Sequence, residues 1–167
     1  LEVQTLMKFL ESHLRAEERS LVENNIRFRA IGRTIDLPQA VRDVIADIEK
    51  KTSHNTGMVL QLALSYSGRE EITRAARILA QRAASGLIRP DEITEELIQA
   101  NLYTADLPDP DLLIRTSGEN RISNFLLWQL AYTEIHITDV LWPDFTRADL
   151  MKAIDDYRSR DRRFGLV

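Results

Sequence analysis

The chain has 167 residues, 44% of them hydrophobic, with a net charge of −4 at pH 7 and no cysteine. This length and hydrophobic content are enough for one domain with a substantial core and leave little room for a second. The charge balance argues against a nucleic-acid-binding surface, and the lack of cysteine excludes disulfides and thiol chemistry.

The distribution of apolar residues bears on where the protein works. The longest apolar runs are only a few residues long, far below the ~20 that a membrane-spanning helix needs. No signal-peptide pattern is visible, and a cysteine-free chain agrees with a reducing compartment. We therefore expect a soluble protein in the cytoplasm. The three histidines, His13, His54 and His136, are too scattered to predict a zinc site.

The first part of the sequence predicts two helices and two strands. Apolar residues at three- and four-residue spacing predict a long amphipathic helix over 1–23, whose apolar face either packs on the core or borders a cavity. Alternation of apolar residues with arginines predicts a strand over 26–31. Pro38 begins the second helix, and the nearly continuous apolar run 58–64 predicts a strand covered on both faces.

The remaining sequence adds further helices. A polar loop at 65–70 leads into a helix predicted over 71–84, and Gly86 is placed to end it. A short helical segment is expected within 90–103, and a last helix over 147–158. Strands that alternate with helices predict an α/β fold with a single-layer, mostly parallel sheet flanked by helices, in one domain.

The most informative feature is a polar loop that follows the apolar strand predicted at 112–114. The strand stops at Arg115, and the next nine residues include a glycine, two serines, two asparagines, a glutamate and a second arginine, Arg121. Apolar residues at 125–131 then recur at helical spacing, which predicts a helix with the pair 123–124 at its N-cap. A fourth strand is expected after this helix.

These residue types suit an anion such as a diphosphate. Two guanidinium groups offer forked donors, Ser123 offers a hydroxyl, and the first amides of a helix carry partial positive charge. Ligands of open α/β sheets bind beyond the carboxyl ends of the strands, which is where Arg115 is placed. The alternative is that Arg115 and Arg121 only pair with Glu119 and Glu134 in a surface network.

The sequence IRTSGENRISNFLLWQ at 114–129 is followed by Tyr132, Glu134 and the motif WPDF. This combination closely resembles the cis-prenyltransferase family, and within it the bacterial undecaprenyl diphosphate synthases. The similarity extends along the chain. EVQTLMKFL resembles the third helix of the family, NIRFRAIG and LALSYSGREEI resemble two of its strands, and DRRFG resembles its C-terminal RxG motif.

The resemblance implies a use for the polar loop. Arg115, Arg121 and Ser123 match the residues with which the family binds the diphosphate of isopentenyl diphosphate. The backbone amide of Ile122 is expected to assist. Glu119 belongs to the same loop, and we expect its carboxylate to hold one of the two arginines in register.

The resemblance also implies a metal ion and a second subunit. Glu134 matches the acidic residue associated with the Mg2+ site of the family, and its oxygens suit that cation. Arg163 and Gly165 match the RxG motif, which in this family reaches across a homodimer interface toward the partner's diphosphate site. On composition alone, this arginine-rich end would be a solvated segment.

Compared with the family, the sequence lacks an amino-terminal third. Nothing in it matches the DGNGRWA phosphate loop, whose aspartate binds Mg2+, or the SxENW segment. We therefore expect a single cis-prenyltransferase domain over 1–167 that lacks its N-terminal phosphate-loop segment. The catalytic residues would lie in that segment, so the 167 residues alone are expected to be inactive.

For the whole protein, the resemblance implies condensation of isopentenyl diphosphate with an allylic diphosphate, expected to be farnesyl diphosphate. The product would be a long-chain cis-polyprenyl diphosphate, undecaprenyl diphosphate for the cell-wall carrier lipid. Such a product partitions to the membrane and would bring the enzyme to the inner membrane face. One alternative is a non-catalytic subunit of a cis-prenyltransferase heteromer, which the retained arginines disfavour. The other is a generic phosphate-binding module, which the lack of GxGxxG and GK[ST] motifs disfavours.

Overall fold

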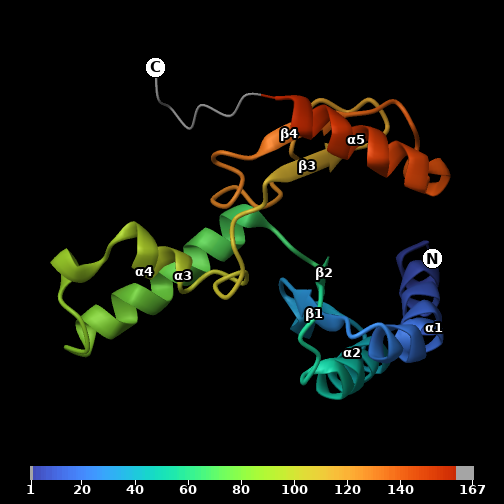
Figure 1. Ribbon diagram of the computed structural model, residues 1–167. Helices are drawn as coiled ribbons and strands as arrows, with labels where there is room; N and C mark the ends of the chain where they lie inside the picture. Colours follow the sequence, from blue (N-terminus) through green and yellow to red (C-terminus); the bar gives the residue numbers. More distant parts are fainter. Residues whose placement is uncertain (1, 161–167) are drawn as a thin grey trace. The chain divides into compact units, whose positions relative to one another are not determined.

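The computed structural model describes residues 2–160 and divides into two compact units, residues 1–66 and residues 67–167. Each unit contains one pair of parallel strands together with flanking helices (Figure 1). The predicted α/β class with parallel strands is therefore confirmed. The four expected strands are all present, and they pair two by two within the units.

The first unit follows the predicted order of elements. It contains the helices α1, Glu2–Glu23, and α2, Gln39–Thr52, and the strands β1, Arg27–Ile31, and β2, Val59–Ala63. A 3-10 turn, Thr34–Asp36, connects β1 to α2. Because β1 and β2 pair in parallel over their full lengths, α2 is the crossover between them.

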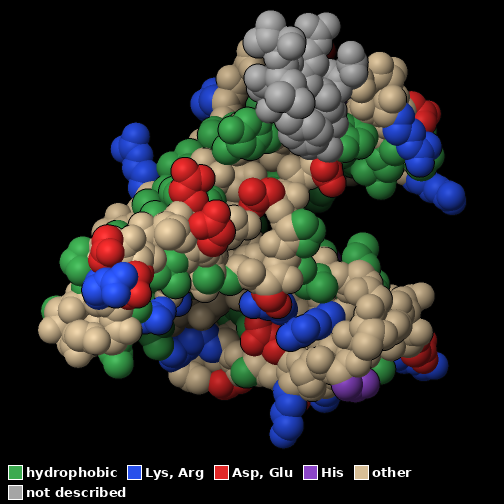
Figure 2. Space-filling view, turned by 60° about the vertical axis from the view of Figure 1, so that its left-hand side comes forward, with side chains coloured by type: hydrophobic (Ala, Val, Ile, Leu, Met, Phe, Trp, Pro, Cys, Tyr) green, Lys and Arg blue, Asp and Glu red, His purple; other side chains and the backbone are tan. Residues whose placement is uncertain are grey.

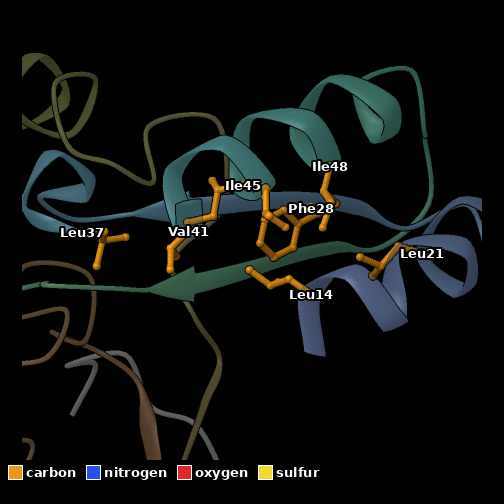
Figure 3. Close-up of a cluster of buried hydrophobic side chains, with 8 residues drawn as sticks. Leu14, Leu21, Phe28, Leu37, Val41, Ile45 and Ile48 are labelled. Carbon is orange, nitrogen blue, oxygen red and sulfur yellow. The ribbon is translucent and has the colours of Figure 1, made fainter. Parts of the chain in front are cut away.

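A cluster of buried aliphatic and aromatic side chains forms the core of the first unit (Figure 3). Phe28 on β1 is only 1% exposed and lies between side chains of both helices. Residues on one face of α2, at the spacing of helical turns, pack against it. The cluster comprises Leu14, Leu21, Phe28, Leu37, Val41, Val44, Ile45 and Ile48.

Two buried polar side chains connect the end of α2 to β1. The Thr52 hydroxyl accepts a hydrogen bond from the Phe28 amide at 3.1 Å and donates one to the Ile48 carbonyl at 2.8 Å. The Asn55 side-chain amide donates to the carbonyl of Ile26 at 2.8 Å. Backbone groups at this edge of the core are thereby satisfied, as buried polar groups must be.

Within residues 67–160, the second unit contains three helices, two strands and two 3-10 turns. These elements are α3, Gly68–Ala84; a turn, Pro90–Glu92; α4, Glu95–Gln99; β3, Leu112–Arg115; β4, Glu134–Ile137; a turn, Trp142–Asp144; and α5, Arg147–Ser159. The strands β3 and β4 pair in parallel, with Leu113 opposite Ile135 and Arg115 opposite Ile137.

Helix α3 begins three residues before its predicted start. The Ser67 hydroxyl accepts a hydrogen bond from the Glu70 amide at 3.2 Å, so Ser67 is the N-cap. The predicted end is confirmed, because Gly86 has a φ of +71° just after the helix. A capping box of Thr146 and Asp149 begins α5.

The helix predicted at 125–131 is wrong, because these residues form a series of turns. Ser123, Asn124 and Leu126 have φ angles of +48°, +64° and +43°, and this left-handed region interrupts an α-helix. The apolar residues of 125–130 recur at this spacing because their side chains are half-buried in the second unit. This spacing does not report the backbone conformation.

Large hydrophobic side chains are exposed in both units, and Figure 2 shows green patches of such side chains among charged ones. In the second unit, Tyr132 and Trp142 are 71% and 72% exposed. Across residues 2–160, no helix combines the length and the apolar character needed to cross a bilayer.

Candidate functional site

A pocket of about 90 Å³ lies where β3 and β4 end and the polar loop begins. The strands contribute Leu113, Arg115, Ile135 and Ile137, which lie opposite one another in pairs. The loop contributes Glu119, Asn120, Arg121 and Ile122. The structure thus brings together four of the residues predicted for the diphosphate, at the carboxyl ends of parallel strands.

Arg115 is the last residue of β3, and one donor of its guanidinium, the Nε, is not satisfied by the fold. Its Nε is buried and has no hydrogen-bond partner within residues 2–160. A buried donor without an acceptor is costly, about 1–3 kcal/mol, and is rare in native structures. The backbone around it is ordinary, since the Arg115 carbonyl accepts from the Thr138 amide at 2.9 Å. An anion in the pocket would satisfy this donor.

The loop that carries the other pocket residues is folded back onto the segment after β4. The amides of Ser117 and Gly118 donate to the carbonyls of Val140 and Thr138, both at 2.9 Å. Ser117 and Gly118 have φ angles of +66° and +63°. A Cβ on Gly118 would lie 2.8 Å from the Asp139 carboxylate, so both the conformation and the space favour glycine.

Arg121 lies on the open side of the pocket. Its side chain is 66% exposed and forms an ion pair with Glu119, as expected for a carboxylate that holds an arginine in register. The pair is solvated, so it contributes little to stability. An exposed guanidinium with one acceptor still has donors for a ligand.

Ser123 and Asn124 do not cap a following helix, because residues 125–131 form turns. Ser123 is not part of the pocket lining. Asn124 instead caps α3: its Oδ1 accepts from the Arg69 amide at 2.9 Å, and its carbonyl accepts from the Gly68 amide at 2.8 Å. Its Nδ2 also donates to the Ser67 hydroxyl at 2.8 Å. The first amides of α3 are therefore occupied within the chain.

A buried carboxylate fixes the turns after the loop. Glu71 on α3 is 1% exposed and accepts hydrogen bonds from the Tyr103 amide at 2.6 Å and from the Gln129 side chain at 3.2 Å. Gln129 is 2% exposed and also donates to Thr104 at 3.0 Å. This network attaches Gln129, which lies within the turns, to Glu71 on α3.

Glu134 does not face the pocket. On β4, Ile135 and Ile137 line the pocket, whereas Glu134 and His136 alternate with them and face α5. The carboxylate of Glu134 forms an ion pair with Arg160 at 2.7 Å, an arginine that the sequence did not single out as its partner. Within residues 2–160, no three acidic or histidine side chains are grouped to hold a metal ion.

The neighbouring carboxylate, Asp156, has a lowered pKa, chiefly because His136 and then Arg160 hydrogen-bond to it. The pKa of Arg160 is raised by its hydrogen bonds to Glu134 and then Asp156. These groups therefore form an ionic cluster on the α5 side of β4.

Sequence reasoning missed Asn120, which lines the pocket, and Arg160, which holds Glu134. The position of Asn120 between Glu119 and Arg121 was the available signal for the first. No sequence signal distinguishes Arg160 from the arginines around it. The predicted residues Arg163 and Gly165 lie outside the described residues.

Together, the fold and the pocket define an α/β protein with an arginine-lined pocket at the ends of parallel strands. The chain matches, over residues 1–165, the prenyltransferase family model described as "Putative undecaprenyl diphosphate synthase". It is 51% identical over 166 residues to an isoprenyl transferase of Heliobacterium mobile, covering 99% of this chain and 64% of the relative. The chain therefore belongs to the undecaprenyl diphosphate synthase family of prenyltransferases.

Other relatives agree. The chain is 47% identical over 166 residues to the ditrans,polycis-undecaprenyl-diphosphate synthase of Xanthomonas axonopodis pv. citri, covering 99% of this chain and 65% of that protein. Lavandulyl diphosphate synthase from Lavandula x intermedia, solved with dimethylallyl diphosphate, matches with a TM-score of 0.95 and 44% identity over 98% of this chain and 71% of that one. A probable undecaprenyl diphosphate synthase from Campylobacter jejuni matches with a TM-score of 0.85 and 35% identity, over 98% and 74% of the two chains. The chain thus spans about two thirds of the length of its relatives.

Proposed function

We propose that the protein that contains this chain is a cis-prenyltransferase, which condenses isopentenyl diphosphate with an allylic diphosphate. The observation that carries the proposal is the unsatisfied Nε of Arg115, buried beside a pocket that Arg121 also lines. We propose farnesyl diphosphate as the allylic substrate and undecaprenyl diphosphate, the cell-wall carrier lipid precursor, as the product. The name of the Xanthomonas relative, an undecaprenyl-diphosphate synthase specific for (2E,6E)-farnesyl diphosphate, supports this choice.

In this proposal, the pocket binds the diphosphate of isopentenyl diphosphate. Arg115 and Arg121 contribute charge-assisted hydrogen bonds from two sides, and the amide of Ile122 contributes a third donor. Glu119 orients Arg121, with which it pairs. Ser123 follows directly on Ile122, and we propose that its hydroxyl binds the same diphosphate. Preorganised cations of this kind stabilise charge without a reacting side chain.

We further propose that the protein uses Mg2+, with Glu134 as its ligand in this chain. A single carboxylate fits this ion, because Mg2+ usually keeps water and phosphate ligands and takes only one or two carboxylates. The side chain of Glu134 is 31% exposed, and its bond to Arg160 involves one of its two oxygens, Oε2. When bound, Mg2+ would offset negative charge on a diphosphate.

The residues that complete catalysis are proposed to lie in an N-terminal phosphate-loop segment of the same cis-prenyltransferase domain. We propose that the 167 residues alone do not transfer prenyl groups. We also propose a homodimer in which Arg163 and Gly165 reach the partner's diphosphate site. The exposed Tyr132 and Trp142 are compatible with such an interface. The long apolar product would enter the membrane, which places the enzyme at the inner membrane face.

The test of the proposal compares substitutions at Arg121 in the full-length protein. Arg121→Ala is expected to weaken isopentenyl diphosphate by about 1.5–3 kcal/mol, the loss of a charge-assisted contact. The allylic substrate should be affected much less. Arg121→Lys should also be impaired, because an ammonium lacks the forked donors. Arg89→Ala is the matched control, since Arg89 is an exposed arginine of the same unit that pairs with Asp91. Equal weakening of both substrates would place Arg121 outside this site.

A further inference from the structure

The two faces of β4 serve different purposes. Ile135 and Ile137 form one wall of the pocket with the arginines. Glu134 and His136 point the other way and contact α5 and the residue after it. A short strand of four residues thus has the proposed substrate site on one face and a group of charged side chains on the other.

Arg160 is the centre of this charged group. Its Nη1 donates to Glu134 at 2.7 Å and to the carbonyl of Ile135 at 3.1 Å, and its Nη2 donates to Asp156 at 2.7 Å. Asp156 also contacts Nδ1 of His136 at 2.7 Å. The guanidinium is therefore bonded to two carboxylates and one backbone carbonyl, a set that only its planar fork can satisfy at once.

A nearby arginine provides the contrast. Arg158 is 70% exposed, and its nearest carboxylate, on Asp155, is 3.8 Å away. The side chain of Arg160 is only 29% exposed. Arg158 is therefore solvated, whereas Arg160 forms its ion pairs within the fold. Three of the five N–H donors of the Arg160 guanidinium are used inside the fold.

The contact with Ile135 connects this group to the pocket. Arg160 binds the main chain of the same residue whose side chain lines the pocket. Within residues 2–160, β4 pairs only with β3, through a ladder of four residues. With so little pairing, the position of β4 depends on contacts from α5 and the residue after it. These are the contact of His136 with Asp156 and the bonds of Arg160 to Glu134 and to the Ile135 carbonyl.

We propose that Arg160 is a positioning residue of the diphosphate pocket: by joining Glu134, Asp156 and the Ile135 carbonyl, it fixes β4 and hence the pocket wall opposite the loop arginines. The inference rests on the proposed function of that pocket. Arg160 does not touch the substrate. It holds the strand that the substrate site is built on, and it holds the Glu134 carboxylate in one orientation.

The first measurement tests the positioning of β4 without any substrate. Hydrogen exchange is followed at the amides of Glu134 and Thr138, which bond the carbonyls of Asp111 and Arg115 at either end of the strand pair. Arg160→Met should speed exchange at both amides by about tenfold. Arg158→Met should leave it unchanged. Arg160→Lys keeps the charge but not the fork, and it should show a smaller change in the same direction. Unchanged exchange in both Arg160 variants would overturn the proposal.

The second measurement concerns the pocket in the full-length protein. Arg160→Met should raise the Kd of isopentenyl diphosphate about tenfold, as loss of a supporting residue typically does. In a double-mutant cycle, adding Glu134→Gln should cost less than it does alone, because the two residues act as a unit. Faster exchange with an unchanged Kd, or strictly additive effects, would refute a positioning role. If the wild-type protein binds no isopentenyl diphosphate, the proposed function fails, and the exchange result still reports on Arg160 and β4.

Discussion

Asn124 offers a sharp test of the structure around the candidate site, because the predicted helix cap and the observed contacts disagree. Its side chain makes two hydrogen bonds, from the Arg69 amide at 2.9 Å and to the Ser67 hydroxyl at 2.8 Å. Its φ is +64°, a conformation that Asn and Gly tolerate and that Ala does not. Two substitutions therefore separate the two contributions.

Asn124→Gly removes the side-chain contacts but keeps the backbone conformation accessible. We expect it to destabilise the second unit by about 1–2 kcal/mol, the value of two lost hydrogen bonds. Asn124→Ala loses the same contacts and adds about 1–2 kcal/mol for an alanine in the left-handed region. Its total cost should be about 2–4 kcal/mol by the same principles. The alanine variant should thus be the less stable of the two.

Urea unfolding followed by tryptophan fluorescence measures these costs. The chain has two tryptophans, Trp128 and Trp142, and both lie in the second unit, so the signal reports on that unit. Asn101→Ala is a useful comparison, because the Asn101 side chain also bonds a backbone group of this unit, the Leu97 carbonyl at 2.7 Å, but lies outside the loop. If Asn124→Ala proved as stable as the wild type, or more stable than Asn124→Gly, the assigned conformation and cap would be wrong.

Three further predictions address other parts of the chain. Thr52→Val keeps the shape of the side chain but leaves the Phe28 amide without its acceptor, so it should destabilise the first unit by about 1–3 kcal/mol in urea unfolding; full stability would exclude the hydrogen bond. The pKa of Asp149 is lowered by hydrogen bonds from the Thr146 hydroxyl and then the Thr146 amide. The ionised carboxylate therefore stabilises α5 fully above the usual carboxylate pKa, and this stabilisation should be lost as the pH falls through the lowered pKa. Amide exchange in α5 should accelerate in acid in the wild type, and this acceleration should disappear in Asp149→Asn. Mixing full-length Arg163→Ala and Arg121→Ala proteins should restore part of the activity if Arg163 serves the partner's site, and should restore none if it serves its own.

The sequence predicted the regular elements of the chain well, because their signals are local. The amphipathic spacing before residue 24 and the apolar run before Ser65 correspond to α1 and β2, with ends shifted by at most a residue or two. Helix α3 begins earlier than predicted because of a serine cap that apolar periodicity does not detect. Such caps are visible in the sequence only when the start of a helix is already known.

The segment after the polar loop could not be predicted, because its conformation depends on contacts distant in the sequence. Asn124 bonds residues at the start of α3, and Gln129 bonds Glu71 and Thr104. These partners are 25 to 58 residues away along the chain. They stabilise turns with left-handed residues where the apolar pattern alone favours a helix.

For the candidate site, the residue types predicted which loop residues line the pocket, but they did not predict which face of each strand meets it. Arg115, Glu119, Arg121 and Ile122 do line one pocket. Glu134 was predicted as a metal ligand, and the structure places it on the opposite face of β4 from that pocket, beside Arg160. The alternation of a strand fixes which residues share a face, yet the sequence does not tell which face meets the ligand.

The most direct measurement compares stability and binding for Arg115→Met. The central claim is that the Arg115 guanidinium serves a ligand and not the fold, because its Nε is buried without a partner. Removing an unsatisfied buried donor should leave the ligand-free second unit as stable as the wild type or about 1 kcal/mol more stable. The same change in the full-length protein should weaken isopentenyl diphosphate at least about tenfold. Loss of about 2 kcal/mol or more of stability with unchanged binding would contradict the claim, and it would assign Arg115 to the surface network that was the alternative.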